Sequence, residues 1–339
     1  ARPKSGYFVH TRRAQAELPA MTAPVQRPVD ISQWEQVLEL VRSRPREGLI
    51  QLGRGMPDIA EPTMKPLIVA LRNAARHGDL RSLYYDSIQG VAALREQVAR
   101  LLLDSGCQIG PDQLLITTGC QEAISAGLRA VCQPGDIVAV DSPCFHGTMQ
   151  TLKGLGIKAL EIPTDPQLGL SLDALELLLN EKRLNAVIAM PTVQNPLGCT
   201  MPLAAKKRLA RLMNDHQVPL IEDGLYAEIQ FGGALSPAVK AFDRDGWVLF
   251  CSSFTKTLAP DFRVGWICGG RFHEALRKLK AVSSMSESQL LSETLATFLE
   301  SGGYDHHLRN LRKRYAAQVD EARALIARHF PRGTLATQP

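Results

Sequence analysis

Short apolar runs that alternate with helical stretches constrain the fold of this chain more than any other feature. Each run is four or five residues long, which predicts strands buried on both faces. Helical spacing of apolar residues separates most of them, as in Leu203–His216. This alternation predicts a mainly parallel α/β sheet that is covered on both faces and binds ligands at the carboxyl ends of its strands. The runs are Leu114–Thr117, 137–140, 186–190, 218–221, 248–251 and 264–268.

The segment 248–269 places one lysine, Lys256, in a polar loop between the last two runs. A lysine flanked by buried strands can lose its proton and act as a nucleophile toward a carbonyl group. Ser253 and Arg263 flank it, and a hydroxyl with a guanidinium suits a phosphate monoester. The loop therefore predicts a phosphorylated carbonyl cofactor on Lys256, namely pyridoxal phosphate. A solvated Lys–Arg pair on the surface is the alternative.

Polar and aromatic residues also follow the other runs. Residues 118–121 open a helix, whose free N–H groups suit a phosphate. Phe145 can cover one face of a flat cofactor, and Asp223 can keep a pyridine nitrogen protonated. Asn195 and Tyr226 can hydrogen-bond a phenolate oxygen on the same ring. Each residue has an ordinary role open to it as a cap, core, turn or surface residue, but their shared location at successive strand ends favours a single site.

Composition excludes several other classes of protein. The 339 residues are 45% hydrophobic and 22% charged, as in an ordinary globular chain. A net charge of +5 is too small to require nucleic acid as a partner. No apolar run approaches the roughly 18 to 20 residues of a membrane span, and no signal peptide is recognisable at the N-terminus. We therefore expect a cytoplasmic protein without a membrane partner.

Two motifs are incomplete in this sequence. The seven cysteines are scattered and form no CxxC pair, which predicts reduced thiols and neither disulfides nor a metal site. A dinucleotide-binding motif needs a third glycine that opens a helix. Asp58, Ile59 and Pro62 follow Gly53-x-Gly55 instead, so we reject a dinucleotide-binding motif here.

From about residue 50 to its end, the chain resembles fold-type I pyridoxal-phosphate enzymes of the aminotransferase family. The resemblance rests on YYDSIQG, TTGCQEA, SPCFHG, QNPLG, EDGLY and SSFTKTLAPDFRVGW. It implies a large cofactor-binding domain over 49–275 and part of a small C-terminal domain over 276–339. Beyond about residue 272 the pattern turns helical and ends in one long amphipathic helix to about Phe330.

The resemblance also implies roles for individual residues. Lys256 resembles the Schiff-base lysine of the family, and Asp223 the partner of the pyridine nitrogen. Tyr226 and Asn195 resemble the pair that contacts the ring 3-oxygen, and Phe145 the stacking aromatic. The residues that resemble the phosphate cup are Gly119, Cys120, Gln121, Ser253 and Arg263, together with Tyr85, which resembles a tyrosine supplied by the other subunit of a homodimer.

The N-terminus resembles part of a regulator. Residues 1–9 resemble the last wing strand of a GntR-type winged helix-turn-helix domain, and 10–48 predict a linker and N-terminal segment. The subgroup implied is the MocR regulators, in which an aminotransferase-like domain exchanges its cofactor linkage with an amino acid or amine effector. DNA would then be bound through a winged-helix domain outside this chain. A stand-alone amino acid aminotransferase and a non-catalytic sensor of cofactor and effector are the alternatives.

The sequence departs from the usual MocR pattern at two places. Asn195 precedes Pro196, as in working aminotransferases, and EDGLY replaces the commoner EDDxY while keeping Asp223 and Tyr226. The first departure favours retained chemistry. The arginine that grips the substrate carboxylate in this family is expected beyond Pro339.

Overall fold

The computed structural model describes residues 18–24, 27–28, 55–57, 61–77, 84–85, 87–231 and 233–339. The predicted wing strand at 1–9 lies outside the described residues, as does most of the predicted linker and N-terminal segment at 10–48. The boundary between a large and a small domain near residue 275 stays a prediction.

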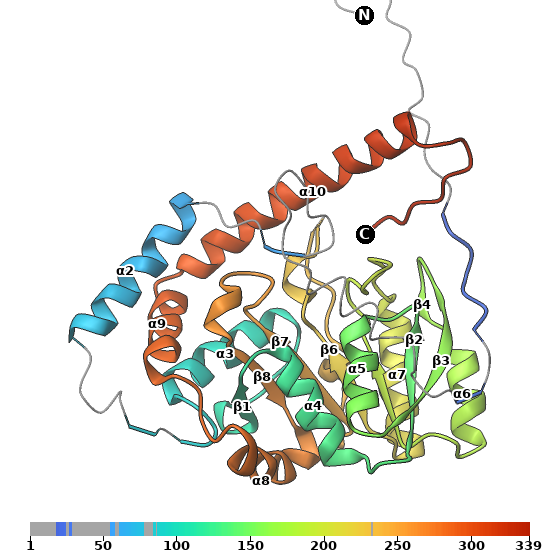
Figure 1. Ribbon diagram of the computed structural model, residues 1–339, viewed down its shortest axis with the longest axis horizontal. Helices are drawn as coiled ribbons and strands as arrows, with labels where there is room; N and C mark the ends of the chain where they lie inside the picture. The colour runs from blue at the N-terminus through green and yellow to red at the C-terminus, as the bar shows by residue number, and fades with distance from the viewer. Residues whose placement is uncertain are drawn as a thin grey trace, which may run out of the picture.

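A single mixed sheet forms the centre of the described chain (Figure 1). Within the described residues its strand order is β1-β8-β7-β6-β5-β2-β3-β4. The pairs from β7 through β6, β5 and β2 to β3 are parallel, whereas β8 runs antiparallel to both its neighbours and β4 antiparallel to β3. The predicted mainly parallel α/β fold is therefore confirmed. The strands are β1 (Leu114–Thr117), β2 (Ile137–Ser142), β3 (Lys158–Asp165), β4 (Gly169–Leu170), β5 (Ala186–Ala189), β6 (Leu220–Asp223), β7 (Val248–Ser253) and β8 (Gly265–Cys268).

Helices connect the parallel strands, because such strands cannot be joined by a tight turn. α5 leads from β2 to β3, and α7 leads from β5 to β6. Three further helices follow β8, as the sequence predicts for the region beyond residue 272. The described α-helices are α2 (Glu61–His77), α3 (Ala92–Asp104), α4 (Cys120–Val131), α5 (His146–Gly154), α6 (Leu172–Asn180), α7 (Leu203–His216), α8 (His273–Ser283), α9 (Gln289–Glu300) and α10 (Gly303–His329).

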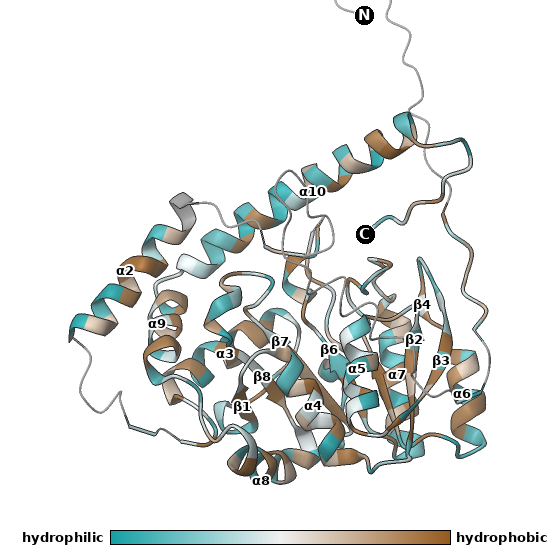
Figure 2. Cartoon of the chain, viewed as in Figure 1, coloured by the Kyte–Doolittle hydropathy of each residue, from teal (hydrophilic) through white to brown (hydrophobic). Residues whose placement is uncertain are grey.

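The core follows the alternation of side chains along each strand. Leu115 and Ile221 pack with α4 and α5 on one face of the sheet. Leu114 and Phe250 point to the other face, where α3, α9 and α10 cover one end. At the other end of that face Val187 packs with α6 and α7. Figure 2 shows largely apolar strands enclosed by helices with polar outer sides.

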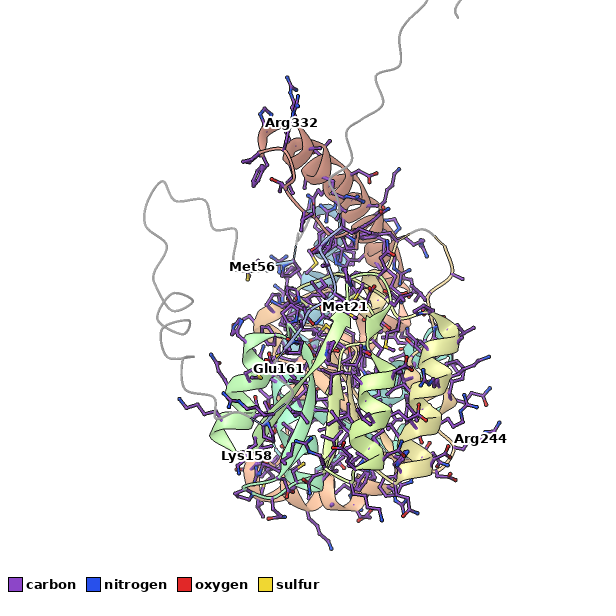
Figure 3. The ribbon with its side chains drawn as sticks, turned by 90° about the vertical axis from the view of Figure 1, so that its right-hand side faces the viewer. Met21, Met56, Lys158, Glu161, Arg244 and Arg332 are labelled. Atoms are coloured by element: carbon purple, nitrogen blue, oxygen red, sulfur yellow. The ribbon has the colours of Figure 1, made fainter. Side chains whose placement is uncertain are left out.

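The parallel strands all end at one edge of the sheet, which we call the carboxyl edge. These strands are β2, β3, β5, β6 and β7. β8 begins there, and Gly265 pairs with Thr117 on one side and Ser253 on the other. A Cβ at Gly265 would lie 2.6 Å from the carbonyl carbon of Gly119, so only glycine allows this close backbone approach. Strand β3 begins at Lys158 and runs past Glu161 toward one end of the molecule in Figure 3. Met56 lies toward that same end. The segment 55–57 therefore lies on the carboxyl-edge side.

Two strands were not predicted. β3 alternates buried with partly exposed residues and contains Pro163, so it has no continuous apolar run. β4 has only two residues. The long helix expected to end near Phe330 is present as α10.

All seven cysteines are free thiols in the structure, and six of them are buried. Among the helices of the described residues, none has both the length and the apolar character needed to cross a membrane.

Candidate functional site

A cavity of about 140 Å³ opens at the carboxyl edge, and we call it the site cavity. Its lining comes from the start of α4, the segment before α5, and the loops after β6 and β7. Far-separated parts of the sequence therefore meet in it. Seven of the predicted site residues line it: Cys120, Gln121, Phe145, Asp223, Ser253, Lys256 and Arg263. A smaller cavity of about 20 Å³ shares Phe145 and Asp223 with it and adds Asn195.

Lys256 lies in the turn that follows β7 and is half-buried. Its Nζ donates a hydrogen bond of 2.8 Å to the carbonyl oxygen of Gly55. Burial, and after it the positive charge of Arg263, lower the pKa of Lys256. Because the neutral amine is the form that attacks a carbonyl carbon, this environment favours the nucleophile.

Arg263 faces the start of α4. Its Nη2 donates to the Thr118 carbonyl oxygen over 3.1 Å. Gly119 has a φ of +84°, and a Cβ there would lie only 2.7 Å from Nη2. A glycine at this position therefore lets the guanidinium approach the helix N-terminus. The guanidinium and the free N–H groups of the first turn together form a positive pocket suited to a phosphate dianion.

Two other residues of the predicted phosphate cup have partners within the protein. The Gln121 side-chain amide donates to the Gly147 carbonyl oxygen (3.2 Å) and to Thr151 Oγ1 (2.5 Å), so it ties α4 to α5. The backbone N–H of Gln121 is then its contribution to an anion site. Ser253 Oγ accepts from the Thr255 N–H over 3.3 Å.

Asp223 is a buried carboxylate at the end of β6. Its Oδ1 accepts from the Leu225 N–H (3.0 Å) and from Cys120 Sγ (3.5 Å). Its Oδ2 accepts no hydrogen bond from any described residue. Burial raises the pKa of Asp223 to about 6, and no cation among the described residues offsets this effect. A buried carboxylate of this kind suits a cationic N–H donor brought by a ligand.

Phe145 and Asn195 lie at the ends of β2 and β5. Phe145 is half-buried and lines both cavities, where its ring can cover a planar group. The backbone N–H of Asn195 donates to Met190 Sδ. The Asn195 side-chain amide makes no hydrogen bond with a described residue and lines the smaller cavity.

Three predicted site residues, Gly119, Tyr226 and Tyr85, line neither cavity. Tyr226 follows β6, and burial, followed by the charge of Asp223, raises its pKa to about 12. It packs against the core cluster that contains α10. Tyr85 is 84% exposed, and Tyr84 beside it is 75% exposed. Their roles stay predictions.

Residues that sequence reasoning missed also contribute to the site. Gly55 contacts Lys256 from 201 positions away, and the only local signal for it is the Gly53-x-Gly55 pair. Thr255 and Leu225 also line the site cavity. The sequence signal for them is that Thr255 precedes Lys256 and that Leu225 lies two positions after Asp223. Asp141 lines the smaller cavity at the end of β2, where burial raises its pKa to about 7.

Comparison with known proteins agrees with the geometry of the site. The family model described as Aminotransferase class I and II matches residues 47–335. The HTH-type transcriptional regulator YjiR of Escherichia coli K12 is 42% identical over 337 residues, which are 99% of this chain and 72% of that protein. YdcR of the same organism is 35% identical, covering 98% of this chain and 70% of its own length. The probable rhizopine catabolism regulatory protein MocR of Rhizobium meliloti is 28% identical, covering 85% and 58%.

Solved structures agree. Kynurenine aminotransferase of Pyrococcus horikoshii superposes with a TM-score of 0.80 at 26% identity, over 90% of this chain and 76% of that one. LysN of Thermus thermophilus, an α-aminoadipate aminotransferase solved with N-(5'-phosphopyridoxyl)-L-leucine, gives 0.75 at 26% identity, over 82% and 70%.

Asp223→Asn is expected to change how stability depends on pH. In the folded chain the pKa of Asp223 is raised from 3.8 to about 6, so the folded state binds this proton more tightly than the unfolded state. Its contribution to stability is therefore present below about pH 4 and is lost as the pH rises to about 6. Asparagine does not ionise, so the free energy of unfolding of the variant minus that of wild type grows by about 2 kcal/mol between pH 4 and pH 7.

Urea unfolding of the cofactor-free chain at both pH values measures this difference. Asp215→Asn, which removes an exposed carboxylate of α7, is the control and should give a difference that stays level. A level difference for Asp223→Asn as well would contradict the assignment.

Proposed function

Because the chain belongs to the class I and II aminotransferase family, we propose that it is the pyridoxal-phosphate-binding domain of a MocR-type transcriptional regulator. The observation that carries the proposal is the meeting of Lys256, Asp223 and Arg263 in one cavity of about 140 Å³. An amine, a carboxylate and a guanidinium match the aldehyde, the ring nitrogen and the phosphate of this cofactor.

The residues present fit that cofactor. Asp223 Oδ2 lacks a donor from any described residue, and a pyridine N–H would supply one. Arg263 and the first turn of α4 would hold the phosphate, and Phe145 would cover one face of the ring. When bound, pyridoxal phosphate supplies an electron-withdrawing ring that stabilises negative charge on a carbon next to an amine.

The protein's own groups then have separate tasks. The Lys256 amine, whose pKa is lowered by burial and by Arg263, provides a neutral nucleophile for a carbonyl carbon. The same Nζ can take a proton from one carbon and return it to another as a general base. The Asp223 carboxylate keeps a proton on the ring nitrogen, and Asn195 and Tyr226 are proposed to hydrogen-bond the ring 3-oxygen.

The regulator assignment rests on relatives that match nearly the whole chain. YjiR and YdcR are HTH-type transcriptional regulators, and the chain spans 72% and 70% of their lengths. We propose that this protein likewise binds DNA through a separate winged-helix domain, and that residues 1–9 are its last strand. The effector is an amino acid or amine, the class of molecule that exchanges with a lysine-bound aldehyde.

Lys256→Ala is expected to abolish attachment of the cofactor. Wild-type chain mixed with pyridoxal phosphate should develop the visible absorbance of cofactor bound to a lysine, and the variant should show none. Lys207→Ala, on the outer surface of α7, is the matched control and should keep the wild-type spectrum. A wild-type spectrum in Lys256→Ala, with circular dichroism showing an intact fold, removes Lys256 from this role.

Transamination by the full-length protein is expected, because Lys256 and Asp223 are both present and Asn195 precedes Pro196. The measurement adds a panel of amino acids with 2-oxoglutarate and follows the oxo-acid product. The alternative is a sensor that exchanges its effector without turnover, and the regulator relatives favour that candidate. Spectral changes with amino acids but without product would select the sensor.

We further propose a homodimer in which Tyr85 of one chain reaches the phosphate of its partner, since Tyr85 is 84% exposed. The holoprotein should sediment with the mass of two chains. Tyr85→Phe should keep that mass and weaken cofactor binding by about fivefold through loss of one hydrogen bond. Tyr84→Phe, its exposed neighbour, should have no effect. A monomer with full cofactor affinity would defeat this proposal.

A further inference from the structure

The first turns of α10 bind the residue that directly follows Lys256. Tyr304 Oη lies 2.7 Å from Thr257 Oγ1, and His307 Nε2 lies 2.7 Å from the Thr257 carbonyl oxygen. A carbonyl oxygen only accepts, so His307 Nε2 is the donor. All three residues are buried. Helix α10 therefore holds both oxygen atoms of Thr257 out of contact with water.

The same helix also binds the turn that follows Tyr226. Tyr304 Oη lies 2.7 Å from Glu228 Oε2, and Arg312 Nε donates to the Glu228 carbonyl oxygen over 2.6 Å. Glu228 belongs to the short helix η3 (Ala227–Ile229). A phenol has one proton, so Tyr304 can donate to the carboxylate and accept from the Thr257 hydroxyl. The loops after β6 and β7 are thus joined through one tyrosine of α10.

Packing fixes the tyrosine that makes this connection. The Tyr304 ring meets Phe254 edge-on, with centroids 5.4 Å apart and an interplanar angle of 88°. Phe254 packs in turn on Trp266 of β8, at 5.0 Å. Because these rings are buried in the core, the Tyr304 hydroxyl has little freedom to turn toward other partners.

We infer that Tyr304 and His307 are positioning residues that act through Thr257 to fix where the Lys256 amine lies in the site cavity. Neither side chain lines the site cavity or the smaller cavity beside it. Thr257 and Lys256 are consecutive residues of one turn, so a shift of Thr257 moves the lysine as well. In Figure 1, α10 continues beyond the body of the molecule, so the helix that anchors Lys256 also leads to the C-terminal segment. The consequence for cofactor binding rests on the proposed function, whereas the positioning itself does not.

The test deletes the same hydrogen bond from either side. Tyr304→Phe and Thr257→Val each remove one hydroxyl and keep nearly the same shape. Thr294→Val is the control, because it removes a buried hydroxyl of α9 that donates within its own helix, to the Leu290 carbonyl oxygen over 2.7 Å. An amine-selective acylating reagent, applied to the cofactor-free 339-residue chain over a pH series, reports the Lys256 amine by peptide mass spectrometry.

A displaced Lys256 becomes better solvated and lies farther from Arg263, the charged group whose field acts on it. The labelling midpoint of Lys256 should therefore rise toward the ordinary lysine value by about half a pH unit in both variants. The double variant should shift it no further than the larger single change, because both variants remove the hydrogen bond between Tyr304 and Thr257. Unchanged midpoints in both single variants, or an equal shift in Thr294→Val, would overturn the inference.

Cofactor binding in the same samples keeps the two claims apart. With pyridoxal phosphate, Tyr304→Phe and Thr257→Val should each bind at least about fivefold more weakly than wild type, in line with loss of the hydrogen bond that they share. Failure of the wild-type chain to bind the cofactor would count against the proposed function. The labelling midpoints would still decide the role of Tyr304 and Thr257.

Discussion

Burial of opposite charges at the carboxyl edge is the constraint on which the account depends. Lys256 and Asp223 line one cavity together with the exposed Arg263. Taking the lysine and the carboxylate out of water is costly unless each finds a partner. The pKa values show this cost, since burial lowers the pKa of Lys256 and raises that of Asp223 to about 6. A ligand with an anionic end beside Arg263 and a cationic N–H beside Asp223 would offset both penalties. Pyridoxal phosphate has this distribution of charge.

The backbone makes that cavity possible. Gly265 lets β8 lie against the Gly119 peptide, and Gly119 in turn leaves room for the Arg263 guanidinium. These contacts bring the start of α4 next to the loop after β7, although these two segments lie far apart in the sequence. The positive pocket therefore depends on two glycines: a Cβ at Gly265 would meet backbone, and one at Gly119 would meet the Arg263 guanidinium. Above it, α10 ties the loops after β6 and β7 together through Tyr304.

The sequence allowed much of the fold and site to be predicted, and the reasons are local. Buried parallel strands such as β6 appear as continuous apolar runs. Asp223 is the last residue of β6, and Lys256 lies three residues beyond the end of β7. Strand β3 was not predicted, because its partly exposed residues interrupt the continuous apolar run that marks the other strands. The contact of Gly55 with Lys256 and the bonds of Tyr304 to Thr257 and Glu228 join distant segments. No local pattern encodes such pairings, so only the folded chain reveals them.

Reductive trapping tests the central claim most directly. Wild-type chain is incubated with pyridoxal phosphate, treated with borohydride and mapped by peptide mass spectrometry, so that any lysine joined to the cofactor is permanently labelled. The account predicts one stoichiometric phosphopyridoxyl group, and it lies on Lys256. A label distributed over other lysines such as Lys206 or Lys240, or no stoichiometric label on Lys256, would contradict the account.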